Sequence, residues 1–265
     1  MHADVREWER LARRLRDAYT SGPVAPMRDS LEAGDGAAAY AVQLINTEYW
    51  QKAGRRIIGR KIGLTAAAVQ KQLGVDQPDY GVLFDDMQIA SGGVLSPAAV
   101  IQPKAEAEIA VVLRKDLCAA TVSLETMADT IDHVCAAIEI VDSRIADWKI
   151  TFADTVADNG SSAFFVLSDT KRKLAGTDLM NCRMEMEVNG QLVSTGTGAA
   201  CLGHPLKAAA WLAATLGAQG TALRAGDVIL TGALGPMATL TPGDRVRAVI
   251  SDIGEARFQY GMAAL

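Results

Sequence analysis

The sequence predicts an α+β fold in which a smaller N-terminal α/β region precedes a larger, mainly β region. Helical patterns cover residues 4–20 and 35–53. Beyond about residue 160, apolar and polar residues alternate between frequent turn residues, as is typical of β-strands. No fixed-period repeat, low-complexity segment or linker divides the chain, and its 265 residues, 49% of them hydrophobic, suffice for one large core. We therefore expect an N-terminal region over 1–75 and a β-rich domain over 76–265.

The two N-terminal helices have recognisable ends. The first stops at the Ser-Gly-Pro of residues 21–23 and the second at Gly54, because glycine adopts the left-handed conformation that ends helices and proline cannot continue one. The stretch "RRIIGRKIGLT" (55–65) then predicts a strand. Thr65 is expected to cap a short helix within 66–74.

The middle of the chain alternates strands with one helix. Turn residues and a short apolar strand occupy 76–86, and the apolar run over 101–113 predicts a buried strand. A helical pattern near 124–136 leads directly into the apolar strand "AIEIVDS" at 137–143. The stretch "SAFFVLS" at 162–168 predicts a further short strand.

The C-terminal third is predicted to contain a hairpin, a helix and two closing strands. Alternating runs over 182–196 flank the Asn-Gly pair at 189–190, and both of these residues tolerate positive φ, which favours a tight β-hairpin. A helix follows over 204–217, with a proline near its start. Gly-Asp turns introduce the two closing strands, at 225–234 and 242–250.

Charge and composition argue against several classes of partner. The net charge is −5 and the pI is near 5.3, and lysine and arginine are not clustered as binding to nucleic acid or an anionic membrane requires. The most basic stretch, "RLARRLRDAY", has apolar residues at helical spacing and is typical of an ordinary amphipathic helix. Three scattered histidines and four cysteines without CxxC pairing give little support to a zinc site.

The sequence also carries no pattern for membrane insertion or export. No run of about 18 apolar residues predicts a membrane span. Asp4, Arg6 and Glu7 stand where a signal peptide would need apolar residues. We therefore expect a cytoplasmic protein.

Three glutamates lie in stretches that otherwise resemble buried strands. Glu106 and Glu108 belong to "IQPKAEAEIAVVL", and because side chains alternate along a strand, both carboxylates leave the same face. Glu139 lies in the middle of the apolar "AAIEIVDS". A buried carboxylate is costly unless it is paired or bound to a cation. Carboxylates without accompanying histidine or cysteine ligands suit a hard divalent ion such as Mg²⁺ or Mn²⁺.

The spacing of the glutamates leaves a second interpretation open. A Glu-x-Glu pair can line the solvent-facing side of an antiparallel strand, and Glu139 can pair with an arginine. Half-exposed strands are common, so the spacing alone does not select the metal site.

Other polar residues in apolar or glycine-rich surroundings are further candidates. Lys61 lies in "GRKIGLT", Asp79 follows a proline in a turn, and Ser161 lies in the turn-like "ADNGSS". The strand "ILTGALG" (229–235) ends in small residues, which lets backbone N–H groups approach a ligand. Each feature also has a purely structural explanation, as a surface lysine, ordinary turn chemistry or a plain strand end.

Taken together, these stretches resemble the fumarylacetoacetate hydrolase superfamily and, within it, the 2-keto-4-pentenoate (2-hydroxypenta-2,4-dienoate) hydratases. The resemblance runs from about residue 8 to the end of the chain. It is carried by "GRKIGLT", "QLGVDQPDYGVLFDDM", "KAEAEIAVVL", "AIEIVDSRI", "DTVADNGSS", "CLGHPLKAAAWLA" and "ILTGALGPM".

The resemblance implies a fold and a metal site. The fold is a compact, mainly β roll of the fumarylacetoacetate hydrolase C-terminal type, which carries the site and follows a smaller N-terminal α/β region. The site holds one Mg²⁺ or Mn²⁺ between an E-x-E pair and an acid on a later strand. These ligands match Glu106, Glu108 and Glu139.

The resemblance also implies catalytic and substrate-binding residues. The family's lysine in G-x-K-x-G-L-T matches Lys61, and its acid in the P-D-[YF]-G turn matches Asp79. These two are the candidate catalytic residues. The candidate substrate-binding residues are Ser161, Leu64 and Thr231.

The activity implied by the resemblance is that of a hydro-lyase. Its substrate is 2-hydroxypenta-2,4-dienoate, a small anionic dienol of the meta-cleavage degradation of aromatic compounds, and its product is 4-hydroxy-2-oxopentanoate. Two alternatives stay open: a 4-oxalocrotonate decarboxylase of the same superfamily, and a non-catalytic scaffold subunit. A homo-oligomer is also implied, and association with neighbouring enzymes of the pathway is a further expectation.

Overall fold

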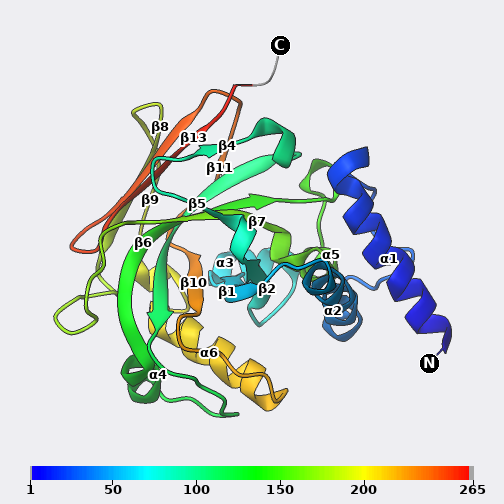
Figure 1. Ribbon diagram of the computed structural model, residues 1–265, viewed down its shortest axis with the longest axis horizontal. Helices are drawn as coiled ribbons and strands as arrows, with labels where there is room; N and C mark the ends of the chain where they lie inside the picture. Colours follow the sequence, from blue (N-terminus) through cyan, green and yellow to red (C-terminus); the bar gives the residue numbers. More distant parts are fainter. Residues whose placement is uncertain (1, 263–265) are drawn as a thin grey trace.

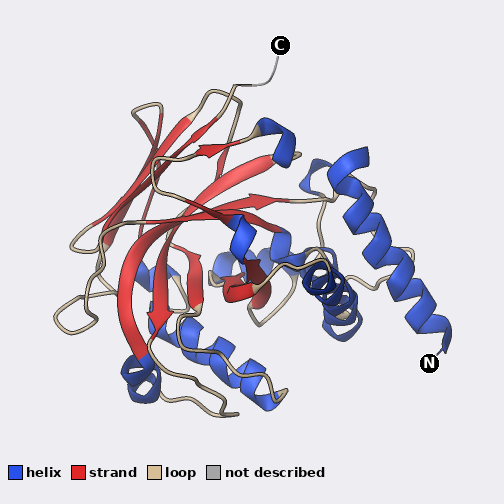
Figure 2. Cartoon of the chain, in the orientation of Figure 1, coloured by secondary structure: helices blue, strands red, loops and turns tan. Residues whose placement is uncertain are grey.

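The computed structural model describes residues 2–262 as two β-sheets flanked by helices (Figures 1 and 2). The large sheet is mixed and has eight strands. In spatial order it contains β2 (Asp79–Phe84), β1 (Ile57–Gly63), β10 (Val228–Ala233), β5 (Pro103–Leu113), β6 (Ile131–Asp142), β7 (Ser162–Leu167) and β3 (Gln88–Ile89), and β11 (Ala238–Thr239) pairs with β5. The small sheet contains β4 (Val94–Leu95), β13 (Gly254–Tyr260), β12 (Arg245–Ile250), β8 (Arg183–Val188) and β9 (Gln191–Thr197).

Helices cover the flanks of the two sheets. Those longer than one turn are α1 (His2–Ser21), α2 (Gly36–Lys52), α3 (Ala67–Leu73), α4 (Leu124–Thr130), α5 (Phe152–Ala157) and α6 (Pro205–Ala218). α1, α2 and α5 lie together on the right of the view in Figure 1, and their apolar side chains share one hydrophobic cluster. α6 packs against β10 and β1 of the large sheet. Among the helices that the structure describes, none has the length and hydropathy needed to cross a bilayer.

Strand β5 explains how the fold creates a polar site inside a core. Its odd-numbered residues, such as Ile109 and Val111, join the cluster between the two sheets and α6. On its other face, Ala110 belongs to a separate apolar cluster within the curve of the large sheet. Because side chains alternate, Glu106 and Glu108 share the face of Ala110 and point into this curve.

Strand β1 joins the N-terminal part of the chain to the large sheet. It is parallel to β10 and antiparallel to β2, so it lies between two strands from beyond residue 75. The region expected over 1–75 therefore contributes a strand to the large sheet. Its helices share their hydrophobic cluster with Ile145 and Phe152, which also come from later in the chain.

One predicted helix is only partly present. The pattern near 124–136 predicted helix throughout, but α4 ends at Thr130 and β6 begins at Ile131. Residues 131–136 are in the strand because β6 pairs with β5 along almost its full length, which buries Val134 and Ala136. Tertiary pairing here overrides the local helical pattern.

Candidate metal and substrate site

The strand register brings the three glutamates together. Glu106 on β5 lies directly opposite Glu139 on β6, and Glu108 is two residues further along the same face of β5. Each residue offers a carboxylate oxygen, and the three oxygens lie within 4.8 Å of one another. Opposed residues in antiparallel strands have close side chains, so the cluster follows from the register itself.

The carboxylates are buried without enough hydrogen-bond donors. Glu108 and Glu139 are 0% exposed and Glu106 is half-buried. One oxygen of Glu108 accepts a 2.8 Å hydrogen bond from the backbone N–H of Gly232, but its Oε1 and both oxygens of Glu139 accept none. Buried carboxylate oxygens rarely lack donors in this way, because desolvation then goes uncompensated.

Burial and mutual repulsion favour protonation of this cluster. Burial, and after it the charge of Glu139, raises the pKa of Glu106 to about 7. Burial also raises the pKa of Glu108, with Glu139 and then Glu106 adding to the effect. The pKa of Glu139 is raised by burial against the opposing charge of Lys61. A cation between the carboxylates would reverse this balance and keep all three ionised.

Lys61 on β1 reaches the same cluster. Its Nζ lies 3.3 Å from Oε2 of Glu139, and both side chains are buried. Strands β10 and β5 separate β1 from β6 in the sheet, so this contact requires the strong curvature visible in Figure 1. Burial opposes the charged ammonium, but the surrounding carboxylates, Glu139 first, raise the pKa of Lys61 above its usual value.

Asp79 begins β2 and lies beside Lys61. It pairs with Gly63 of β1, where a side chain could not fit, because a Cβ at residue 63 would lie 2.2 Å from the Asp79 Oδ1. Asp79 is 1% exposed, and Oδ1 accepts no hydrogen bond. Burial raises the pKa of Asp79, and the charge of Lys61 opposes the rise.

A cavity of about 390 Å³ opens onto these groups. Lys61, Asp79 and Glu106 line it, and so do the predicted substrate-binding residues Leu64 and Ser161. Its size suits a small organic ligand rather than a lone ion.

Thr231, the third predicted substrate-binding residue, does not line the cavity. Its side chain is fully buried, and its hydroxyl donates a 2.8 Å hydrogen bond to the carbonyl oxygen of Ile109. The prediction came from the resemblance of "ILTGALGPM" to the family. The structure instead brings the following Ala233 to the cavity wall.

The turn before β7 holds Ser161 in an uncommon conformation. Asn159, Gly160 and Ser161 all have positive φ, at 58°, 62° and 52°. Asn159 anchors the turn through two hydrogen bonds with the backbone of Val82 on β2, at 2.7 and 3.0 Å. The Ser161 hydroxyl lies 3.2 Å from that of Thr155. Such strain persists where the surroundings fix the backbone, and it is found often at functional sites.

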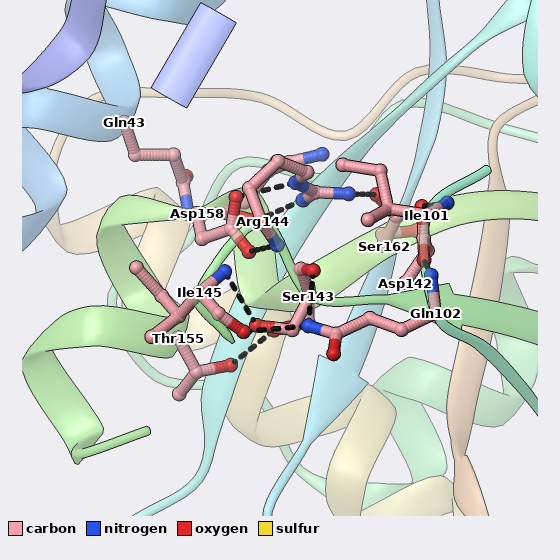
Figure 3. A network of polar contacts seen from close by, with 12 residues as sticks. Gln43, Ile101, Gln102, Asp142, Ser143, Arg144, Ile145, Thr155, Asp158 and Ser162 are labelled. Carbon is pink, nitrogen blue, oxygen red and sulfur yellow. Dashed lines mark hydrogen bonds and ion pairs between the residues drawn. The ribbon is translucent and has the colours of Figure 1, made fainter. Parts of the chain in front are cut away.

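Sequence reasoning missed the arginine that supports this turn. Figure 3 shows Arg144 buried beside Asp158, the residue before the turn. The Arg144 backbone N–H and Nε both donate to the Asp158 carboxylate, and its other guanidinium nitrogens donate to the carbonyl oxygens of Asp158 and Ser162. The motif "AIEIVDSRI" contained this arginine, but nothing in its spacing showed which acid it would meet.

Trp148 is a second residue that sequence reasoning missed. It lines the cavity from a loop in which Asp147 and Trp148 both have positive φ, at 59° and 55°. Its indole N–H donates a 3.0 Å hydrogen bond to the carbonyl oxygen of Gln102. The Nζ of Lys104 lies 4.3 Å from the centre of its ring. A tryptophan in a polar loop was the only sequence signal that could have indicated this role.

The donor set fits a hard divalent cation. Carboxylate oxygens from two adjacent strands converge, several of them lack hydrogen bonds, and no histidine or cysteine takes part. The half-barrel sheet and this site together define a β-roll protein with a carboxylate floor beneath a ligand-sized cavity.

Comparison with known proteins identifies the family. The chain belongs to the fumarylacetoacetate hydrolase family, since the family model described as "Fumarylacetoacetate (FAA) hydrolase C-terminal" matches residues 57–259. This range begins at β1 and includes all the candidate site residues. The predicted family and fold are confirmed.

Curated relatives match the chain over nearly its whole length. A 2-keto-4-pentenoate hydratase of Burkholderia vietnamiensis (strain G4 / LMG 22486) is 52% identical over 94% of this chain and 96% of the relative. A 2-hydroxyhexa-2,4-dienoate hydratase of Comamonas testosteroni is 42% identical over 95% of each chain. Among solved structures, the 4-oxalocrotonate decarboxylase of Pseudomonas putida G7, complexed with magnesium and adipate, has a TM-score of 0.91 and 32% identity, covering 96% of this chain and 97% of that one.

Proposed function

We propose that this chain is a divalent-metal-dependent hydro-lyase that adds water to 2-hydroxypenta-2,4-dienoate to give 4-hydroxy-2-oxopentanoate. The step belongs to the meta-cleavage degradation of aromatic compounds. The observation that carries the proposal is that full-length curated relatives named 2-keto-4-pentenoate hydratase share about half of the residues of this chain, far more than the decarboxylase shares. The cavity with its carboxylate floor supports the same reaction.

The three glutamates are the proposed holders of the metal. Glu106, Glu108 and Glu139 would bind Mg²⁺ or Mn²⁺, and the magnesium in the related decarboxylase structure supports this choice. When bound, the ion supplies positive charge that attracts a 2-oxo acid head and stabilises negative charge on its 2-oxygen. The orphaned oxygens of Glu108 and Glu139 are the structural support for this assignment.

The reaction itself requires a defined set of proton movements. A proton leaves the 2-hydroxyl and another is added at C5, which gives an α,β-unsaturated 2-oxo acid. The oxygen of water then adds to C4, and a proton is added to C3. Each transfer by a positioned side chain contributes roughly 10²–10⁴-fold to the rate.

Asp79 and Lys61 are the proposed acid–base pair. Asp79 is buried with one free oxygen, and its raised pKa suits a group that both takes and gives a proton. Lys61 stays cationic among the carboxylates, so it can donate a proton or pair with the carboxylate of the substrate. Ser161 offers a hydroxyl to a substrate oxygen, and Leu64 contacts the carbon chain from the cavity wall.

Substitution of Asp79 tests this pair. Asp79→Asn is expected to lower kcat by roughly 10²-fold or more, because it removes the proton-transferring group and keeps its shape. Mg²⁺ affinity, measured by calorimetry, should change little. An unchanged kcat would remove Asp79 from the mechanism.

The function is tested with the purified chain and the dienol. Loss of the ultraviolet absorbance of 2-hydroxypenta-2,4-dienoate, with formation of 4-hydroxy-2-oxopentanoate, is expected in Mg²⁺ or Mn²⁺ and is expected to stop after exhaustive EDTA treatment. Full activity in EDTA would contradict metal dependence. No turnover in saturating Mn²⁺ would instead favour the scaffold subunit.

Decarboxylation is the second candidate activity. It is favoured by the similarity between the backbone of this chain and that of the decarboxylase of the same family, with a TM-score of 0.91. It would act on 4-oxalocrotonate and release CO₂. Incubating the chain with each substrate while measuring CO₂ separates the two activities, and the proposal expects hydration without CO₂.

A further inference from the structure

The outer edge of strand β2 is held by side chains. β2 lies at the edge of the large sheet, and alternate residues of an edge strand direct their N–H and C=O groups away from the sheet. The N–H of Tyr80 donates a 3.1 Å hydrogen bond to the hydroxyl of Tyr40 on α2, and its carbonyl oxygen accepts a 3.0 Å bond from Nε2 of Gln43. Two residues along, Val82 bonds to Asn159 in the same manner. These side chains take the place of a neighbouring strand.

Gln43 bonds to two separate parts of the fold. A side-chain amide nitrogen has two N–H donors. Besides the carbonyl oxygen of Tyr80, Nε2 of Gln43 donates to that of Val156 on α5, at 2.8 Å. Gln43 is 4% exposed, so both bonds are shielded from water. One buried side chain therefore joins the beginning of β2 to the end of α5.

Both carbonyl groups that this amide binds lie next to residues of the cavity. Asp79 precedes Tyr80 in the chain, and Thr155 precedes Val156. The hydroxyl of Thr155 lies 3.2 Å from that of Ser161, and these two residues are called the hydroxyl pair below. Asp79 and the hydroxyl pair all line the cavity. The amide therefore sets the spacing between a candidate acid–base residue and the hydroxyl pair.

Tyr40 holds the same peptide from the other side. Its ring stacks on that of Tyr80, with 4.5 Å between the ring centres and 20° between the ring planes. Burial raises the pKa of the Tyr40 hydroxyl, and the charge of Asp79 adds to the rise, so this hydroxyl stays neutral. Tyr40 and Gln43 are three residues apart on α2 and share one face of the helix. This face of α2 therefore fixes both backbone polar groups of the residue that follows Asp79.

We infer that Gln43 is a positioning residue, which holds Asp79 at a fixed distance from the hydroxyl pair, and that Tyr40 assists it. This inference rests on the proposed function, in which Asp79 transfers protons and Ser161 binds a substrate oxygen. Gln43 and Tyr40 are not among the residues that line the cavity, so both act through other residues. Displacing a reacting group by about 1 Å can lower a rate by about 10²-fold.

Turnover of a variant without the amide tests the inference. Gln43→Met keeps the length of the side chain and removes both donors. With saturating Mg²⁺, kcat for hydration of 2-hydroxypenta-2,4-dienoate is expected to fall at least about 10-fold. The Kd for Mg²⁺, measured by calorimetry, should stay within about 2-fold, because the glutamates lie on β5 and β6. An unchanged kcat would overturn the inference.

Two further variants guard against a general loss of structure. Tyr40→Phe removes one hydroxyl, keeps the stacked ring, and is expected to lower kcat at least about 3-fold. Thr47→Val is the control, because Thr47 is also buried on α2 and its hydroxyl bonds within the helix, to the carbonyl oxygen of Gln43. It should lower the melting temperature and leave kcat within about 2-fold. A loss of kcat in Thr47→Val equal to that in Gln43→Met would overturn the inference.

A double-mutant cycle shows whether Gln43 acts through Asp79. In an Asp79→Asn background, Gln43→Met is expected to lower kcat by no more than about 3-fold, since the group that it positions no longer transfers protons. A merely structural role would lower kcat by the same factor in both backgrounds, and that result would overturn the inference.

Hydrogen exchange separates this inference from the proposed function, because it needs no turnover. In the Mg²⁺-loaded chain, Gln43→Met is expected to speed amide exchange at least about 10-fold in both 79–84 and 155–161, but not in 103–113. Faster exchange in one of the two segments alone, or in neither, would overturn the inference. If both segments exchange faster but the wild type hydrates no dienoate, the positioning by Gln43 stands and the proposed function falls.

Discussion

Two buried charged clusters lie within this fold, and they differ in how completely their polar atoms are paired. In the Arg144–Asp158 pair, both carboxylate oxygens of Asp158 accept hydrogen bonds, and every guanidinium nitrogen of Arg144 donates one. In the glutamate cluster, neither oxygen of Glu139 accepts one. Arg144, Asp158, Glu108 and Glu139 are almost inaccessible to solvent, and Glu106 is half-buried.

This difference distinguishes a structural cluster from a functional one. In the Arg144–Asp158 pair every polar atom has a partner, so the pair needs no ligand, and it holds the turn before β7 in place. A buried group of like charges whose oxygens lack hydrogen bonds destabilises the folded state. It is expected where a bound ligand supplies the missing partners. The two clusters should therefore respond in opposite ways when a charge is removed.

The largest expected effect is in the glutamate cluster. Glu139→Gln is expected to lower kcat/KM at low Mg²⁺ by at least about 10³-fold, because charge stabilisation by a metal is worth several kcal/mol. Metal-free Glu108→Gln should melt no lower than the wild type, since it removes a buried charge that is not part of the Lys61–Glu139 ion pair. Initial rates and thermal unfolding measure the two effects.

Glu185 on β8 provides the control, because it is an exposed strand glutamate that does not line the cavity. Glu185→Gln should change neither measurement. A Glu139→Gln variant that keeps its activity at low Mg²⁺ would contradict the assignment of the glutamate cluster as the metal site.

The next effect is in the completed network. Arg144→Met should destabilise the chain by about 3–5 kcal/mol in urea unfolding, because Asp158 stays buried without its partner. Arg224→Met, at an exposed pair with Asp116, should cost no more than about 1 kcal/mol. An equal loss of unfolding free energy in the two variants would show that the buried pair stabilises the chain no more than the exposed pair does.

The pH dependence of stability should also differ between metal-free and metal-loaded protein. The pKa of Glu106 is raised to about 7 by burial, so between about pH 4.5 and 7 the folded state binds more protons than the unfolded state. Stability of the metal-free chain should therefore fall as pH rises through this window.

In Glu106→Gln, stability should fall less as pH rises. Saturating Mg²⁺ should also reduce the loss of stability in the wild type, because it binds the ionised carboxylates. Urea unfolding at several pH values measures all three cases. A wild type that gains stability over this window relative to Glu106→Gln would contradict the raised pKa.

The smallest expected effect concerns Thr231, which lies outside both clusters. Thr231→Val removes its hydrogen bond to Ile109 and should cost about 1 kcal/mol of stability. Its kcat/KM should stay within about 2-fold of the wild type, whereas Ser161→Ala at the cavity should lower it further. A large loss of activity in Thr231→Val would return Thr231 to the list of substrate-binding residues.

Local sequence patterns placed two of the three glutamates of the cluster relative to each other. Alternation along a strand is enough to place Glu106 and Glu108 on one face. No local pattern says that Glu139 lies opposite Glu106, because register depends on pairing between distant segments. The family resemblance supplied that link.

The missed features depend on tertiary structure in a similar way. Residues 131–136 follow a helical pattern and become strand only through pairing with β5. The importance of Trp148 becomes visible only in its left-handed backbone and its bond to Gln102. Thr231 does not line the cavity, because its hydroxyl is directed into the sheet and bonds the carbonyl oxygen of Ile109.

The position of β1 between β2 and β10 has a consequence for synthesis. Lys61 is made early, but its neighbour in the sheet, Leu230 of β10, leaves the ribosome only when the chain is almost finished. Contacts between such distant segments form slowly. A growing chain can pair β1 with β2 early, but it lacks β10 for most of translation, and a product truncated before β10 cannot complete the pairing on both sides of Lys61.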